Sequence, residues 1–182
     1  ISWNVLYTDF IASAYPEVPA LFLYRDPVEV IASVMNETTA VLHAKGTREA
    51  EFLTEHTVNE TAEMTDVAYL AECYARYFET VGASNMPNLS WLNYADLKAE
   101  RFGDIIARGL SFQPTESVLR EMLEQFQFHS KDDSDSTTFR ADGQDKRQSM
   151  SVDEKALINE VCGGSYRALN NAPENLFPKS VS

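Results

Sequence analysis

A short apolar run that ends in a charged turn constrains the fold more than any other stretch of this chain. The run over 20–24 reads Ala-Leu-Phe-Leu-Tyr, is too short for an independent helix and is preceded by two prolines, so it predicts a buried β-strand. Pro27 suits the first position of a helix because its missing N–H is harmless there, and Asp26 can cap the free amides. Arg25 and Ser33 are therefore expected at the carboxyl end of a strand and two turns into the next helix, where open α/β sheets bind ligands.

Two interpretations of Arg25 and Ser33 remain open from the residues alone. A helix N-terminus presents free amides and the positive end of the helix dipole, and a guanidinium adds a planar fork that suits phosphate or carboxylate. Ser33 lies eight residues after Arg25, so both side chains reach one anion only if it lies along the flank of the helix. The alternative is that Arg25 pairs with Asp26 or Glu29 and that Ser33 is an ordinary surface residue.

Strands and helices alternate along the rest of the chain. A second strand is predicted over 88–94, and apolar spacing of three and four residues predicts helices over 4–15, 27–35, 67–81, 101–110 and 116–128, with a last helix that begins at Ser151 or Asp153. This alternation is typical of a parallel sheet with crossover helices. We expect the 182 residues to form one α/β domain, with coil after the last helix.

Two polar stretches interrupt this pattern. The stretch 36–61 is expected to mix loop with a short helix near 48–57, and it could form a lid that faces a substrate. The stretch 130–151 is rich in Ser, Asp, Thr, Lys and Arg, a composition that buries little, so it predicts a loop that is mobile when nothing is bound. Its basic cluster, which includes Arg140 and Lys146, is of a kind that is usually solvated but can also fold over a phosphate-bearing ligand.

Charge and hydropathy argue against several classes of partner. A formal net charge of -13 argues against a general nucleic-acid or anionic-membrane surface, since such partners need a net basic face. No apolar run approaches the roughly 20 residues that span a bilayer. The first residues also lack the basic start and apolar core of a signal peptide. Because the chain starts at Ile1 in the middle of an amphipathic pattern, we expect that an upstream part has been removed.

The sequence gives little support for metal or nucleophile chemistry. Cys73 and Cys162 fall on apolar helix sides without metal-ligand spacing, so buried free thiols are predicted rather than a disulfide. The three histidines are scattered over loop-like segments with no zinc-binding spacing, and no metal is expected. Tyr94 and Asp96, just past the second strand, are better placed for ligand contact. A packed ring and a helix cap are their alternative roles.

The segment 24–30, Tyr-Arg-Asp-Pro-Val-Glu-Val, followed by Ser33, resembles the arginine-to-serine segment of sulfotransferases that use 3′-phosphoadenosine 5′-phosphosulfate (PAPS). In that family the arginine and the serine eight positions later hold the 3′-phosphate of the cofactor. The resemblance therefore implies that Arg25 and Ser33 bind that phosphate. It also implies transfer of a sulfuryl group from PAPS to an acceptor hydroxyl or amine, with 3′-phosphoadenosine 5′-phosphate (PAP) as the product.

Two later segments are similar to bacterial members of the family in order and separation. They are Asn-Tyr-Ala-Asp-Leu over 93–97, and Phe-Arg-Ala-Asp over 139–142 followed by Lys146. The resemblance implies that Tyr94 approaches the adenosine and that Arg140 and Lys146, in the late loop, close on the nucleotide. The Arg-Lys-Gly triplet that many cytosolic members use against the 3′-phosphate is absent from this sequence. The similarity to bacterial members also implies a cytoplasmic location rather than a secretory lumen.

The resemblance implies a P-loop-NTPase-like parallel sheet flanked by helices, but the chain contains no Gly-rich loop with Lys and Ser or Thr. In family spacing that loop and its strand lie upstream of Ile1. Residues 1–182 are therefore expected to form one truncated domain, the carboxyl-terminal two-thirds of a sulfotransferase. The catalytic residues are then unknown, and this fragment alone is expected to be inactive. An exposed sheet edge or a missing amino-terminal piece would lead it to associate.

Three functional hypotheses follow from the sequence. The first is a PAPS-dependent sulfotransferase whose acceptor is a small molecule or a carbohydrate. The second is a non-catalytic α/β domain of the same shape that serves in binding or assembly. The third, a relative of nucleoside or nucleotide kinases, rests on fold analogy alone.

Overall fold

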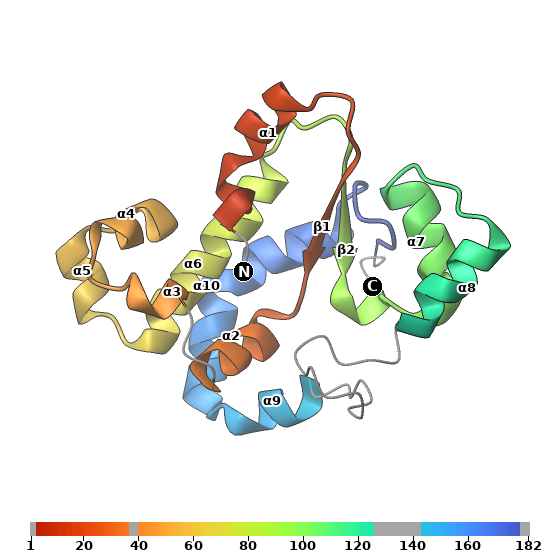
Figure 1. Cartoon of the computed structure of the whole chain (residues 1–182). Helices are drawn as coiled ribbons and strands as arrows, with labels where there is room; N and C mark the ends of the chain where they lie inside the picture. Colours follow the sequence, from red (N-terminus) through yellow and green to blue (C-terminus); the bar gives the residue numbers. More distant parts are fainter. Residues whose placement is uncertain (1–2, 37–39, 126–142, 179–182) are drawn as a thin grey trace.

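A two-stranded parallel sheet with helices on both faces forms the framework of the fold (Figure 1). The computed structural model describes residues 3–36, 40–125 and 143–178. Strand β1 spans Ala20–Tyr24 and strand β2 spans Leu89–Asn93, and they run parallel with Phe22 opposite Trp91. The mixed α/β character and the parallel pairing are as predicted. The P-loop-NTPase-like sheet stays a prediction, because a sheet of two strands does not define the strand order of that fold.

Helices make up most of the remaining structure. In chain order, with 3-10 helices marked η, the described helical elements are η1 (Trp3–Tyr7), α1 (Thr8–Ala14), α2 (Pro27–Asn36), α3 (Ala40–His43), α4 (Arg48–Thr54), α5 (Val58–Glu63), α6 (Asp66–Gly82), η2 (Tyr94–Asp96), η3 (Ala99–Arg101), α7 (Phe102–Gly109), α8 (Glu116–Gln125), α9 (Gly143–Ser149) and α10 (Val152–Asn171). Among these helices, none combines the length and the apolar character that a membrane crossing requires.

The two faces of the sheet are covered by different helices. On one face Tyr24 of β1 makes edge-on ring contacts with Phe78 of α6 and Tyr166 of α10, with ring centroids 6.2 Å and 5.9 Å away. On the other face Leu92 of β2 packs with Ile105 of α7. Helices thus cover both faces of the sheet, which is the usual condition of a parallel sheet, although Leu23 of β1 remains 47% exposed.

The stretch 36–61 is more helical than the sequence predicts. Three short helices, α3 to α5, lie in or overlap this stretch. Helix α4 packs against α6 (Figure 1). Ala50 and Leu53 of α4 are fully buried. Thr57 caps α5 through a reciprocal pair of hydrogen bonds with Glu60, in which Glu60 N donates to Thr57 Oγ1 at 3.3 Å and Thr57 N donates to Glu60 Oε2 at 2.8 Å. The proposed lid role of this stretch stays a prediction.

Both cysteines are buried free thiols, as predicted. The thiol of Cys162 on α10 lies 3.0 Å from the carbonyl oxygen of Ala71 on α6. Burial raises the pKa of Cys73 and of Cys162 to about 12. Both sulfurs therefore stay protonated near neutral pH and pack as small apolar groups between α6 and α10.

Helix α10 begins after Ser151, one of the two predicted starts. Glu154 N donates to Ser151 Oγ at 3.2 Å, and Ser151 N donates to Glu154 Oε2 at 2.8 Å, which completes a capping box. We expect Ser151→Ala to lower the free energy of unfolding by about 1 kcal/mol, because a helix-end amide loses its acceptor. Chemical denaturation measures this change. Ser13→Ala, at an exposed serine of α1, is the control and should not destabilise the protein. If Ser151→Ala left the denaturation midpoint unaltered, the proposed stabilising role of the Ser151 cap would be wrong.

The tail that follows α10 is irregular, as predicted, but it is docked on the sheet. Trp91 N donates to Glu174 O at 3.0 Å and Leu176 N donates to Trp91 O at 2.9 Å, so Asn175 forms a parallel bridge with β2. The side chain of Asn175 is 2% exposed and donates from Nδ2 to Tyr24 Oη at 2.8 Å. The tail therefore covers the outer edge of β2.

Helix α9 occupies the described part of the stretch 130–151 that the sequence predicts as a loop. Residues 126–142 lie outside the described residues, whereas Gly143–Ser149 are helical and Met150 is buried. Helix α9 packs against α2, below the sheet in Figure 1. Lys146 and Arg147 of α9 contact Ser33 and Glu29 of α2, and the composition of the stretch does not reveal these partners.

Candidate anion-binding site

Helix α2 starts with a side-chain cap at the end of β1. Asp26 Oδ1 accepts hydrogen bonds from Val28 N at 3.0 Å and from Glu29 N at 3.3 Å, as the sequence predicts. Pro27 has no N–H to offer. An anion at this end of α2 would therefore be held by side chains along the flank of the helix rather than by these first amides.

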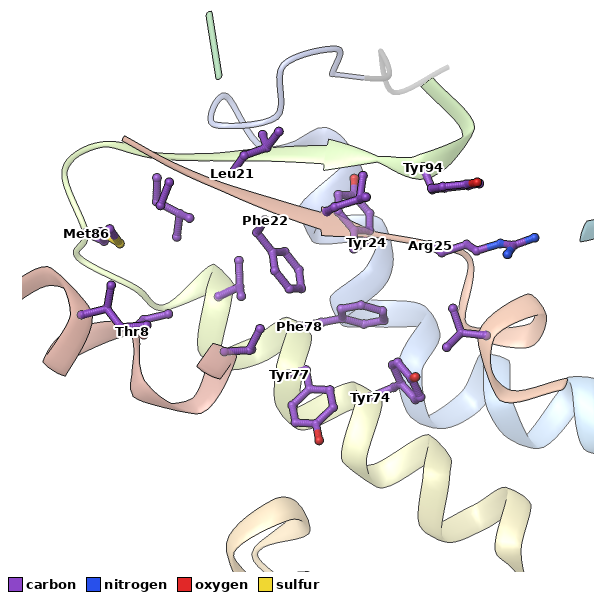
Figure 2. A pocket seen from close by; sticks show the side chains of 17 residues that line it. Thr8, Leu21, Phe22, Tyr24, Arg25, Tyr74, Tyr77, Phe78, Met86 and Tyr94 are labelled. Atoms are coloured by element: carbon purple, nitrogen blue, oxygen red, sulfur yellow. The ribbon is translucent and has the colours of Figure 1, made fainter. Parts of the chain in front are cut away.

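Arg25 and Tyr94 lie side by side just beyond the ends of the two strands (Figure 2). Because Tyr24 is opposite Asn93 in the parallel register, the next residue of each strand leaves the sheet at the same place. The Cζ atom of Arg25 lies 5.1 Å from the centroid of the Tyr94 ring, within the range of a cation–π contact. Arg25 Nε also donates to Glu29 Oε2 at 2.7 Å, so the alternative pairing considered from the sequence is present.

Ser33 contacts a residue that is distant in the sequence. Lys146 of α9 donates from Nζ to Ser33 Oγ at 3.1 Å, across a separation of 113 residues. Ser33 is therefore not an isolated surface position. The packing of α9 on α2 brings two of the predicted site residues into direct contact. Arg140, which is also a predicted site residue, lies outside the described residues.

Arg147 joins this site, although the sequence points only to a basic cluster around it. Its Nη2 lies 2.8 Å from Asp26 Oδ2, and its Nε lies 2.8 Å from Glu29 Oε1. The adjacent basic residues at 146 and 147 are the signal in the sequence. Which acidic side chains they meet is visible only once α9 is placed on α2.

Glu29 links the two arginines of the site. One of its oxygens accepts from Arg25 Nε and the other from Arg147 Nε. Burial alone would raise the pKa of Glu29, but the hydrogen bonds from Arg147 and Arg25 outweigh it and leave the pKa below its ordinary value. The hydrogen bond with Glu29 also raises the pKa of Arg147. Glu29 is therefore ionised at neutral pH, and an incoming anion competes with it for two guanidinium groups.

An apolar groove of about 470 Å³ opens beside Arg25 and Tyr94 (Figure 2). It lies between β1, α6 and the first helices of the chain, and nearly all of its lining is aliphatic or aromatic. Phe22 projects from β1 toward Phe78 of α6 inside it. Arg25 and Tyr94 thus lie at one end of an otherwise apolar groove.

Asp96 pairs with a basic residue, because its Oδ1 accepts from Arg101 Nη1 at 3.1 Å. The side-chain cap at the start of η2 comes from Asn93, whose Oδ1 accepts from Ala95 N at 3.0 Å. Within the described ranges, no three His, Cys, Asp or Glu side chains gather as a metal site would need.

Comparison with known proteins assigns the chain to no family. No family model, no curated protein and no solved structure matches the chain. The functional argument therefore rests on the arrangement of Arg25, Ser33, Tyr94 and Lys146.

Proposed function

We propose that Arg25, Ser33, Tyr94 and Lys146 bind the 3′-phosphate and the adenosine of PAPS, and that the protein is a PAPS-dependent sulfotransferase domain. The observation that carries the proposal is the 3.1 Å hydrogen bond from Lys146 Nζ to Ser33 Oγ. It joins two segments that lie far apart in the sequence. At both positions, the residues in contact are those to which the sulfotransferase resemblance gives a role on the cofactor.

The chemistry of these side chains suits a phosphate that lies next to a purine. Guanidinium, ammonium and hydroxyl groups all donate hydrogen bonds, and those from the two cations are the stronger, charge-assisted kind. The ring of Tyr94 supplies a planar surface beside Arg25. A nucleotide with a 3′-phosphate would use the donors and the ring, whereas a nucleotide without one would use mainly the ring.

The proposed reaction is in-line transfer of a sulfuryl group. The bond from sulfur to the 5′-phosphate oxygen breaks, a bond from sulfur to the acceptor oxygen or nitrogen forms, and the proton of the acceptor passes to a base. Arg25, Ser33 and Lys146 would contribute affinity and register, because the 3′-phosphate lies away from the reacting atoms. No residue of this chain is assigned to the base or to the bridging oxygen.

A non-catalytic binding or assembly domain is the second candidate, and the ion network is the observation that favours it. Arg25 pairs with Glu29, and Arg147 pairs with both Glu29 and Asp26, so α9 is held on α2 without any ligand. On this hypothesis the same contacts serve only to fix α9. The two candidates differ in one measurable property, because a purely structural network has no preference for a 3′-phosphate.

Ser33→Ala tests the proposed function with a small perturbation. We expect PAP binding to weaken by about 0.5–1.5 kcal/mol because one hydrogen bond to the 3′-phosphate is lost. Binding of adenosine 5′-phosphate (AMP), which lacks that phosphate, should be unchanged. Isothermal titration calorimetry measures both affinities. The matched control is Ser165→Ala, at a serine whose hydroxyl donates to Cys162 O within α10. Equal losses for the two nucleotides, or no loss for PAP, would favour the second candidate.

A further inference from the structure

Asn93, the last residue of β2, has a buried side chain that makes three hydrogen bonds. It is 1% exposed. Its Nδ2 donates to Tyr166 Oη at 2.9 Å and to Asn170 Oδ1 at 2.8 Å, and its Oδ1 accepts from Ala95 N at 3.0 Å. Both N–H donors and the oxygen of the amide are therefore in use. Because Tyr166 and Asn170 belong to α10, this side chain fixes the end of β2 on that helix.

The end of β1 is fixed by the same group on α10. Tyr24 Oη also donates to Asn170 Oδ1, at 3.0 Å. Asn170 Nδ2 donates to Tyr166 O at 3.1 Å, which sets the direction of the Asn170 amide. The oxygen of Asn170 thus accepts one hydrogen bond from the last residue of each strand. Arg25 and Tyr94, the residues that follow, therefore leave the sheet from two anchored positions.

The hydrogen bond from Ala95 N to Asn93 Oδ1 closes a turn around Tyr94. An asparagine oxygen that accepts from the amide two residues later mimics a backbone turn and restrains the residue between them. Tyr94 itself is only partly buried, and its ring lies beside the guanidinium of Arg25, with 5.1 Å from the centroid to Cζ (Figure 2). The direction of this ring therefore depends on the turn that Asn93 closes.

We propose that Asn93 is a positioning residue that holds the ring of Tyr94 against Arg25 and thereby sets the affinity of the site for an adenine base. This inference rests on the proposed function, in which Tyr94 meets the adenosine. Since Asn93 is buried, it acts through Tyr94 rather than by touching the nucleotide. A change at this position should therefore weaken PAP and AMP by the same factor, because the two nucleotides share the base.

The alternative is that this buried network only stabilises the fold, and Asn175 separates the two roles. Asn175 is almost as buried as Asn93, at 2% exposed, and it donates to Tyr24 Oη in the same network at 2.8 Å. Its other hydrogen bonds go to α10 and to the tail, away from the turn at Tyr94. Asn175→Ala should therefore lower the stability but leave the affinity of the folded protein for AMP unchanged.

Titration calorimetry with PAP and AMP tests the effect on affinity. Asn93→Ala should weaken the binding of both nucleotides by about threefold to tenfold, the value of one misplaced aromatic contact. Asn93→Ser should weaken it by at most about twofold, because a serine hydroxyl can accept from Ala95 N in the same kind of turn. Both variants lose the two Nδ2 hydrogen bonds, so a difference between them reports the turn and not the stability of the network.

Two measurements on the free protein report the position of the Tyr94 ring. The amide of Ala95 should exchange slowly in the unaltered protein, although Ala95 is exposed, because it donates within the turn. Protons above an aromatic ring resonate upfield in NMR spectra, so the side-chain signals of Arg25 should be shifted upfield. That shift should be lost in Asn93→Ala and kept in Asn93→Ser and in Asn175→Ala.

Three results would overturn the role of Asn93. They are rapid exchange of the Ala95 amide in the unaltered protein, an upfield shift that survives in Asn93→Ala, and a loss of AMP affinity in Asn175→Ala as large as in Asn93→Ala. Failure of the proposed function gives a different pattern. The unaltered protein would then bind PAP no more tightly than AMP, while the upfield shift of Arg25 would still depend on Asn93.

Discussion

Replacing Arg25 with alanine is expected to weaken PAP binding by about 1.5–3 kcal/mol, roughly tenfold to a hundredfold, because a charge-assisted contact with the 3′-phosphate is lost. The guanidinium is fixed between the ring of Tyr94, 5.1 Å from its centroid, and the carboxylate of Glu29. AMP has no 3′-phosphate, so its affinity should change far less. Titration calorimetry with both nucleotides measures how much Arg25→Ala changes the affinity for PAP and for AMP.

Arg101 offers a matched control for this experiment. It also lies over an aromatic ring, with its Cζ 4.7 Å from the centroid of Phe177, and it also pairs with a carboxylate, that of Asp96. Arg101→Ala therefore removes a guanidinium with the same kinds of contact, but away from the proposed site. It should leave the affinities for PAP and AMP unchanged. If Arg25→Ala weakened PAP and AMP equally, the assignment of Arg25 to the 3′-phosphate would be wrong.

Asn175→Ala is expected to lower the free energy of unfolding by about 2–3 kcal/mol, since its removal leaves buried polar groups without partners. Asn175 Nδ2 donates to Tyr24 Oη at 2.8 Å, to Leu169 O at 3.2 Å and to Asn170 O at 3.3 Å. Its Oδ1 accepts from Phe177 N at 3.0 Å. Burial also raises the pKa of Tyr24, so its hydroxyl stays protonated and donates to Asn170 Oδ1 at 3.0 Å.

Urea denaturation monitored by circular dichroism measures the loss of stability in Asn175→Ala. Asn171→Ala is the control, because Asn171 is exposed at the end of α10. A loss as small as that of the control would mean that the tail is not docked on the sheet in solution, in conflict with the bridge between Asn175 and Trp91.

The strand–turn–helix unit can be predicted from the sequence because its signals are local. Five apolar residues make β1, Asp26 caps the following helix and Pro27 begins it, and all three features fall within a dozen residues. The apolar stripe of α6 is equally local, since residues three and four apart share a face of a helix. No distant contact is needed to place these elements.

Helix α9 and the docked tail cannot be predicted in this way, because distant partners order them. Arg147 meets Glu29 across 118 residues, and Asn175 meets Tyr24 across 151 residues. Polar residues whose partners lie in another segment look like a solvated loop when only their own neighbours are considered. Composition alone therefore describes α9 as part of a loop.

Four of the residues that the sequence points to lie close to one another, but the charges around them do not follow from the sequence. The sequence names Arg25, Ser33, Tyr94 and Lys146, and the structure brings them together as two contacting pairs. Glu29 and Arg147 connect the segments that carry these pairs, and this role follows only from the packing of α9 on α2. The position of Glu29 means that phosphate binding must compete with an internal carboxylate.

The affinities of the unaltered protein for PAP and for AMP test the central claim most directly. The two nucleotides differ only by the 3′-phosphate, the group assigned to Arg25, Ser33 and Lys146. Titration calorimetry should show PAP binding at least about tenfold more tightly than AMP, as charge-assisted hydrogen bonds to that phosphate require. Equal affinities for the two nucleotides, or no binding of either, would contradict the account.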